Sequence, residues 1–200
     1  MRAYTLVELL IAMAIIASVG GIILSIFFLS LRGSIKTDTV TVVRQNGNNA
    51  ISQMARIIRD ARRFDDVSTD GFTWQNNCIQ PQANPPPPPA QYQYVRVTSS
   101  DPGQSTLICK FDPGGGLPLT IASSSAPLPK PPALTPTRSL LLDTSVVTLN
   151  DCYFTCYQET AAQNPVIGIH FDLSSRTTSG FVEGSSSLPF ATSVTLRNKD

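Results

Sequence analysis

The sequence contains four cysteines, and their type and number indicate disulfide chemistry. They are Cys78, Cys109, Cys152 and Cys156. An even count in an exported chain indicates two disulfides, and four cysteines allow three pairings. On a straight strand Cys152 and Cys156 would lie roughly 13 Å apart, which is too far to bridge. A bend between them would allow a local bond, and we favour Cys152 with Cys156 and Cys78 with Cys109. The spacing lacks the C-x-x-C knuckle of a zinc site, so we expect no metal.

Other residues that could do chemistry do not form a recognisable constellation. His170 is the only histidine and lies in a strand-like segment, opposite the face of Ile169 and Phe171, which is typical of a surface or structural histidine. The sequence has no phosphate-binding glycine loop, no nucleophile elbow and no metal-type histidine spacing. We therefore expect that the protein is not an enzyme and that it uses no cofactor.

Two groups of charged residues, one acidic and one basic, could form binding sites. Asp65, Asp66 and Asp70 offer the oxygen ligands that calcium prefers, but they lack a loop with regular ligand spacing, so calcium is not expected. The basic residues that recur at helical spacing are Arg56, Arg59 and Arg63. They are interpreted as a solvated face, or else as contacts to acids on a neighbouring subunit or a ligand. Without clustered basic and aromatic residues, no nucleic-acid partner is expected.

Glu8 stands out because of its surroundings. It lies just inside a segment, residues 4–31, whose stretch from Leu9 to Leu31 contains no charged residue over about 23 positions. Roughly 20 apolar residues in a helix span the hydrocarbon core of a bilayer. A carboxylate near bilayer depth costs on the order of a few kcal/mol unless it is paired or interfacial. The segment is longer than the apolar core of a cleaved signal peptide.

The residues from Ala3 to Ala14, AYTLVELLIAMA, resemble the N-terminal motif of the type IV pilin and pseudopilin family. The resemblance is close over roughly the first 30 residues. It implies a short leader, residues 1–3, that a prepilin peptidase removes between Ala3 and Tyr4, followed by methylation of Tyr4. Ala3 departs from the glycine that the family prefers before the cut.

The resemblance gives Glu8 a role in assembly. After cleavage the amine of Tyr4 is a cation, and in a filament of staggered helices Glu8 of one subunit can meet the amine of a neighbour. Such a pair is attractive in low dielectric, whereas either charge alone is penalised. The alternative is that Glu8 sits at the lipid interface and favours the helix start. Ala17, Gly21 and Ser25 recur every four residues, which either allows close helix packing or reflects ordinary membrane-helix composition.

The chain beyond the membrane segment is expected to continue the helix over residues 32–64. An apolar stripe at 3-to-4 spacing follows Val40, Val43, Gly47, Ile51, Met54, Ile58 and Ala61. The stripe predicts one rod of about 60 residues whose outer half packs on a domain. Residues 65–200 would form that domain.

The domain is predicted to be β-rich. Charged residues make up only 14% of the chain, the net charge is +1, and 16 prolines break the sequence into short segments. Proline-rich loops are placed at 80–90, which holds Pro85 to Pro89, and at 126–136. The first is interpreted chiefly as a spacer, although it could also bind a partner. The expected strands are 91–97, 106–111, 139–142, 146–157, 166–173 and 191–196.

The sequence therefore predicts an α+β protein: a long N-terminal helix, half membrane-spanning and half amphipathic, packed on an antiparallel β-sheet. The function implied by the resemblance is that of a minor pilin or pseudopilin in a pilus or secretion filament. Its partners would be other subunits, the prepilin peptidase and the membrane, crossed once with the domain outside. The alternative is a membrane-tethered binding or adhesion module that does not assemble.

Overall fold

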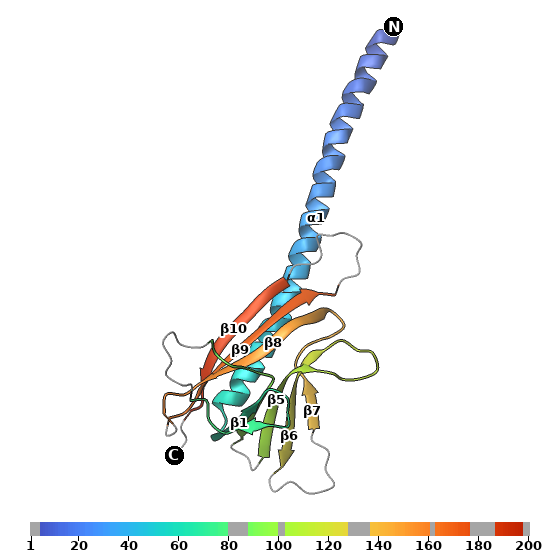
Figure 1. Cartoon of the computed structure of the whole chain (residues 1–200). Helices are drawn as coiled ribbons and strands as arrows, with labels where there is room; N and C mark the ends of the chain where they lie inside the picture. Colours follow the sequence, from blue (N-terminus) through green and yellow to red (C-terminus); the bar gives the residue numbers. More distant parts are fainter. Residues whose placement is uncertain are drawn as a thin grey trace.

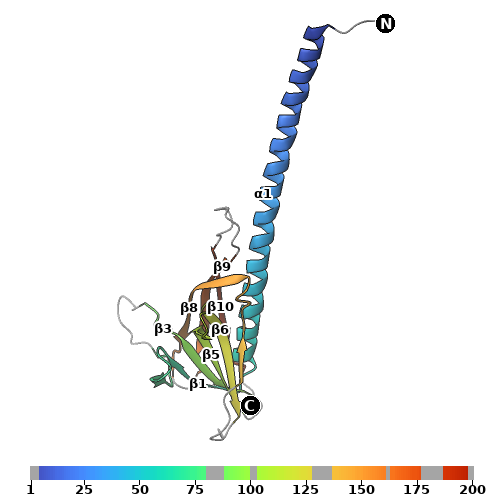
Figure 2. The same ribbon diagram turned by 90° about the vertical axis from the view of Figure 1, so that its right-hand side faces the viewer.

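One long helix and a domain built of strands make up the described part of the protein. The computed structural model describes residues 5–79, 88–99, 103–127, 137–160, 163–176 and 187–197. Helix α1 (Leu6–Arg59) comes first, and its N-terminal part projects away from the strands (Figure 1). The strands lie beside its C-terminal part only (Figure 2). The expected class, α+β with a mostly antiparallel β domain, is confirmed.

Helix α1 ends earlier than the sequence predicts. It runs without interruption through Gly20 and Gly21 but stops at Arg59 rather than at residue 64. The N–H of Asp60 still donates to the Arg56 carbonyl at 2.9 Å, whereas the N–H of Arg62 donates to the Thr98 carbonyl at 2.8 Å. Because the backbone after Asp60 pairs with another strand, the chain leaves the helix and enters β1 (Arg63–Ser68) directly.

The larger sheet has six strands in the order β2-β1-β4-β5-β6-β7. Its remaining members are β2 (Trp74–Gln75), β4 (Tyr94–Thr98), β5 (Gly103–Phe111), β6 (Thr120–Pro127) and β7 (Thr137–Leu140). All of its pairings are antiparallel. Strands β1, β2 and β6 were not predicted.

A second sheet of four strands replaces the single sheet that we expected. Its order is β10-β9-β8-β3, and its members are β3 (Gln91–Tyr92), β8 (Val147–Tyr157), β9 (Val166–Ser175) and β10 (Ser187–Thr195). The predicted strand 91–97 is divided at Gln93. Residues before the division pair with β8, and residues after it pair with β1 and β5. Tyr92 is consequently buried, whereas Tyr94 is half-exposed.

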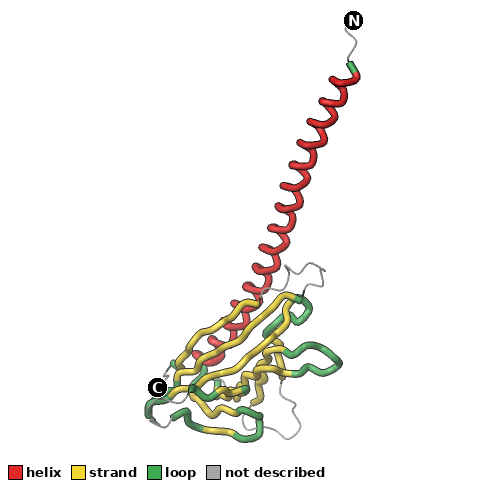
Figure 3. Tube along the Cα trace, turned by 45° about the horizontal axis from the view of Figure 1, so that its top comes forward, coloured by secondary structure: helices red, strands yellow, loops and turns green. Residues whose placement is uncertain are grey.

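The strands lie beside the C-terminal part of α1 (Figure 3), and the hydrophobic core draws on the helix and on both sheets. The expected inner face of β9 is confirmed, since its four apolar residues are all buried: Ile167, Ile169, Phe171 and Leu173. From α1, Val43, Met54 and Ile58 belong to the same buried cluster. Ala50 is also buried there, although the predicted stripe did not include it.

The proline-rich stretches fall partly outside the described residues. Of the loop at 80–90, residues 88–90 are described, and they are exposed and outside any strand. Pro85 to Pro87 lie outside the described residues. Of the stretch 126–136, Ala126 and Pro127 are described, and they form the end of β6 rather than a loop. The predicted loop is therefore wrong for these two residues, and residues 128–136 lie outside the described residues.

Candidate functional site

The N-terminal half of α1 presents an apolar surface that covers every side of the helix. From Leu6 to Leu31, the large hydrophobic side chains are between 44% and 77% exposed. Among the described residues, this is the one helix that is long and apolar enough to cross a membrane. Exposure of so many large apolar side chains is unfavourable in water, because each buried CH₂ stabilises by about 0.8 kcal/mol. Such a surface requires lipid or other protein around it.

Glu8 lies in the first turn of this surface. The helix starts at Thr5, whose side chain accepts a hydrogen bond from the Glu8 N–H at 3.4 Å and whose carbonyl accepts a second at 3.1 Å. Thr5 and Glu8 have the T-x-x-E spacing of a helix capping box. The Glu8 side chain is exposed, and within the described part of the chain no partner for its carboxylate is found. Sequence reasoning missed the role of Thr5, although this spacing would have revealed it.

The small residues of the apolar half lie on an open surface. The Ser25 hydroxyl donates to the Gly21 carbonyl at 2.8 Å, so its polar group is satisfied within the helix. A Cβ atom added at Gly21 would meet no atom within 4 Å, and Ala17 is exposed. These residues could accommodate a close neighbour, and they remain exposed among the residues that the structure describes. The predicted cleavage residues, Ala3 and Tyr4, lie outside the described residues.

The disulfide pairing that we favoured is wrong. The bonds are Cys78–Cys156 and Cys109–Cys152, with Cα–Cα distances of 5.5 and 5.4 Å. Cys152 and Cys156 lie in one continuous strand, β8, and the bulge in that strand falls at Leu149 to Asp151, before them rather than between them. Without a bend between them, the two cysteines cannot reach each other and each bridges to another element.

Strand β8 therefore anchors two separate parts of the domain. Cys109 belongs to β5 of the larger sheet, so its bond to Cys152 joins the two sheets. Beside it, Lys110 forms an ion pair with Asp151 at 2.7 Å. The hydrogen bond from Lys110 is the main cause of the lowered pKa of Asp151.

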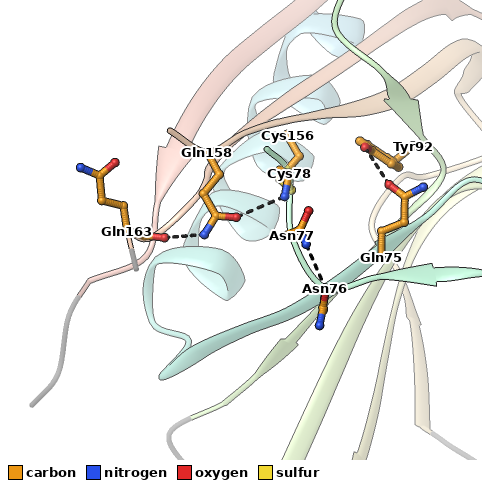
Figure 4. The surroundings of a disulfide bond; sticks show 8 residues. All are labelled: Gln75, Asn76, Asn77, Cys78, Tyr92, Cys156, Gln158 and Gln163. Carbon is orange, nitrogen blue, oxygen red and sulfur yellow. Dashed lines mark hydrogen bonds between the residues drawn. A yellow bond between two sulfur atoms is a disulfide. The ribbon is translucent and has the colours of Figure 1, made fainter. Parts of the chain in front are cut away.

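The second disulfide fixes the chain that leads into the proline-rich stretch. Figure 4 shows Gln158 beside it, accepting a hydrogen bond from the Cys78 N–H at 3.1 Å and donating to the Gln163 carbonyl at 2.7 Å. Cys78 is thus held to β8 by a covalent bond and a buried hydrogen bond.

The three aspartates considered for calcium are held by different donors. Asp66 forms a paired ion contact with Arg96, with oxygen-to-nitrogen distances of 2.7 and 2.8 Å. Asp65 accepts hydrogen bonds from Thr98 and Gln104 as well as from Arg63. The Asp70 carboxylate accepts the Thr73 and Phe72 N–H groups, which hold its pKa well below the ordinary range. Across the described residues, no group of three or more acidic, histidine or cysteine side chains is placed to hold a metal.

His170 takes part in contacts within the four-stranded sheet. Its ring stacks on Tyr153 with centroids 4.9 Å apart, and its Nε2 lies 3.4 Å from the Thr155 hydroxyl. Both partners are on the adjacent strand β8. These contacts account for a structural histidine on the face opposite Ile169 and Phe171.

Comparison of the chain with protein-family models, with curated proteins and with solved structures finds no match. The functional assignment therefore depends on the residues themselves. One candidate membrane helix near the N-terminus and two disulfides in the strand domain are compatible with a single-pass membrane protein whose domain is extracytoplasmic.

Proposed function

We propose that this protein is a minor pilin or pseudopilin, a structural subunit that enters a filament through the N-terminal half of α1. The observation that carries the proposal is an apolar helix, exposed on all sides, whose first turn holds one carboxylate without a partner in the described chain. In a simple anchor, an acid at that place could only favour the start of the helix. In a subunit that packs beside identical or related helices, the acid can also form an ion pair, because a neighbour can supply the opposite charge.

In this proposal, Glu8 sets the register between subunits. The prepilin peptidase cuts between Ala3 and Tyr4, and the new amine of Tyr4 is a cation at the end of the helix. Glu8 of an adjacent subunit then pairs with that amine in a low-dielectric environment, where losing one partner leaves the other charge uncompensated. The apolar surface around both charges is buried against neighbouring helices, after having been buried in lipid.

The outer half of α1 and the sheets act as one rigid unit in this proposal. Gly47 lets the ring of Phe190, from β10, approach the helix so closely that any side chain at position 47 would collide with it. Phe190 in turn stacks on Phe171 of β9 with ring centroids 5.1 Å apart. A helix held in this way would transmit a pull on its apolar half directly to the domain.

Mass spectrometry of the N-terminus of the native protein tests the processing step. The proposal predicts a chain that begins at Tyr4 and carries a methyl group on its amine. A native protein that retains Ala3 ahead of Tyr4 would contradict it, because the cation that Glu8 requires would then be displaced.

A second candidate function is a membrane-tethered binding module, and the cap at Thr5 favours it. Since Thr5 and Glu8 have capping-box spacing, an acid at position 8 stabilises the first turn of a helix without any neighbour. Under this alternative, Glu8→Gln leaves binding unchanged and the protein stays a single subunit in the membrane. Under the filament proposal, the same substitution removes the subunit from the filament.

A further inference from the structure

Helix α1 ends within the strand domain, away from its apolar half (Figure 1), and five arginines lie around this end. A helix of 54 residues is about 80 Å long, so this end lies far from Leu6. We call this group the arginine patch, and all its members are exposed: Arg56, Arg59, Arg62, Arg63 and Arg197.

The fold brings the members of the patch together from three elements. Arg56 and Arg59 are three residues apart in the last turn of α1, where such residues share a face. Arg62 and Arg63 follow at the start of β1. Arg197 comes from the C-terminal end of the chain, and its N–H donates to the Arg59 carbonyl at 3.3 Å. The sequence pattern alone indicated neither Arg62 nor Arg197.

Most of the positive charge in the patch is not neutralised. Two members pair with acids, Arg56 with Asp60 at 3.6 Å and Arg63 with Asp65 at 3.1 Å. For Arg59, Arg62 and Arg197, the described residues supply no acidic partner. Five arginines and two aspartates give the patch a charge of +3, so the other ten basic and twelve acidic residues carry −2. The nearly neutral chain is therefore polarised toward this end.

Stabilisation of the end of α1 explains only some of the arginines in the patch. Basic residues in the last turn favour a helix C-terminus, which accounts for Arg56 and Arg59. The other three lie beyond the helix, where the macrodipole has little effect. Exposed guanidinium groups without a partner are suited to bidentate contacts with carboxylate or phosphate.

We propose that the arginine patch binds an acidic polysaccharide, whose carboxylates are separated along the chain by sugar hydroxyl groups. The acid within the patch decides between this ligand and a nucleic acid. The Asp60 side chain is 58% exposed among the arginines. A duplex carries one charge per about 1.7 Å of its axis and would place phosphates against this carboxylate. A polysaccharide can place hydroxyl donors there and carboxylates on the arginines on either side.

Titration of the full-length protein in detergent micelles with polygalacturonate oligosaccharides tests the proposal. Binding is expected at low salt, weakening as salt is added, and Arg59→Gln/Arg62→Gln/Arg197→Gln is expected to lower affinity by at least about tenfold. The matched control, Arg44→Gln/Arg138→Gln/Arg176→Gln, removes the same charge from other exposed sites and should change affinity less than about twofold. Failure of the wild-type protein to bind, or an equal loss in both triple variants, would overturn the proposal.

Asp60→Asn separates the acidic polysaccharide from a nucleic acid. If hydroxyl groups of the sugar donate to Asp60, the substitution lowers affinity for polygalacturonate, because the amide is a weaker acceptor. A 20-base-pair DNA duplex serves as the comparison, and it should bind more weakly than polygalacturonate to the wild-type protein. Tighter binding of the duplex, with a further gain in Asp60→Asn, would overturn the polysaccharide and indicate a nucleic-acid surface instead. Circular dichroism of each variant shows whether the fold is retained.

Discussion

The two halves of α1 belong to one continuous helix but have opposite relations to their surroundings. Met13, in the N-terminal half, is 63% exposed, whereas Met54, in the C-terminal half, is fully buried. The N-terminal half is apolar on every side, and its large apolar side chains remain exposed in the described part of the chain. The C-terminal half is apolar along one stripe, which joins the core of the domain. The difference shows that one half is covered by its own chain, whereas the apolar surface of the other half requires lipid or other protein around it.

Reduction of the two disulfides should have the largest effect, because it should unfold the strand domain and leave the N-terminal half of α1 intact. The bonded cysteines are separated by 78 and 43 positions in the sequence, and each bond is expected to contribute about 4 kcal/mol to the stability of the domain. Reduction in detergent should therefore unfold the strand domain while the N-terminal half of α1 stays helical. Loss of near-ultraviolet circular dichroism together with a remaining helical signal would confirm this. An unchanged unfolding midpoint after complete reduction would contradict the assigned role of the disulfides.

The two methionines provide a matched comparison within the helix. Met54→Ala removes a side chain from the core and should destabilise the domain by about 2 to 5 kcal/mol. Met13→Ala makes the same chemical change on the exposed half and should alter domain stability by less than about 0.5 kcal/mol. Urea unfolding of the domain in detergent, followed by tryptophan fluorescence, measures both. Equal effects would mean that the contrast between the halves is wrong.

Two glycines of α1 test the contact with β10. Gly47→Ala should destabilise the domain by about 1 to 3 kcal/mol, because the new methyl group collides with Phe190, whose ring is held by Phe171. Gly33→Ala is the control, since nothing lies within 4 Å of a Cβ atom there, and it should stabilise the helix by up to about 1 kcal/mol. Thermal unfolding compares the two. Stabilisation by both substitutions would show that Phe190 moves away freely.

Acidification should lower the stability of the domain by less than the changes above. Hydrogen bonds lower the pKa values of Asp70, Asp143 and Asp151 below their ordinary value near 3.8. A carboxyl group with a lowered pKa in the folded state stabilises the fold fully above about pH 4, and that contribution is lost as the pH falls through the lower, folded-state values. The melting temperature should therefore fall below about pH 4. Asp151→Asn should lessen this fall, and a melting temperature that rises on acidification would contradict the hydrogen bonds.

Some features of this protein were predictable from its sequence because they depend on local spacing. Residues that recur at helical or alternating intervals gave the long helix, most of its buried stripe and the inner face of β9. The chemistry of Glu8 was visible because an acid in an apolar run is conspicuous in any conformation. Its place beside Thr5 in a helix capping box follows from the T-x-x-E spacing, so it could also have been predicted from the sequence.

Features that depend on contacts between distant segments were not predictable in the same way. The division of one predicted strand between two sheets at Gln93 depends on which strands pair with it. The disulfides follow from where β5 and β8 meet, since neither cysteine of β8 can reach the other. The arginine patch is completed by Arg197, which is brought to the end of α1 by the last strand. In each case alternation along the chain says nothing about which segments become neighbours.

The central claim is that the carboxylate of Glu8 is there for a neighbouring subunit. The direct test expresses the wild-type protein, Glu8→Ala and Glu8→Gln at equal levels in the native cell and measures each in sheared filaments and in the membrane. The account predicts that both variants reach the membrane with the domain folded and oxidised but are lost from the filament fraction. Recovery of Glu8→Ala in filaments at the wild-type level, or a wild-type protein that is never found outside the membrane, would contradict it.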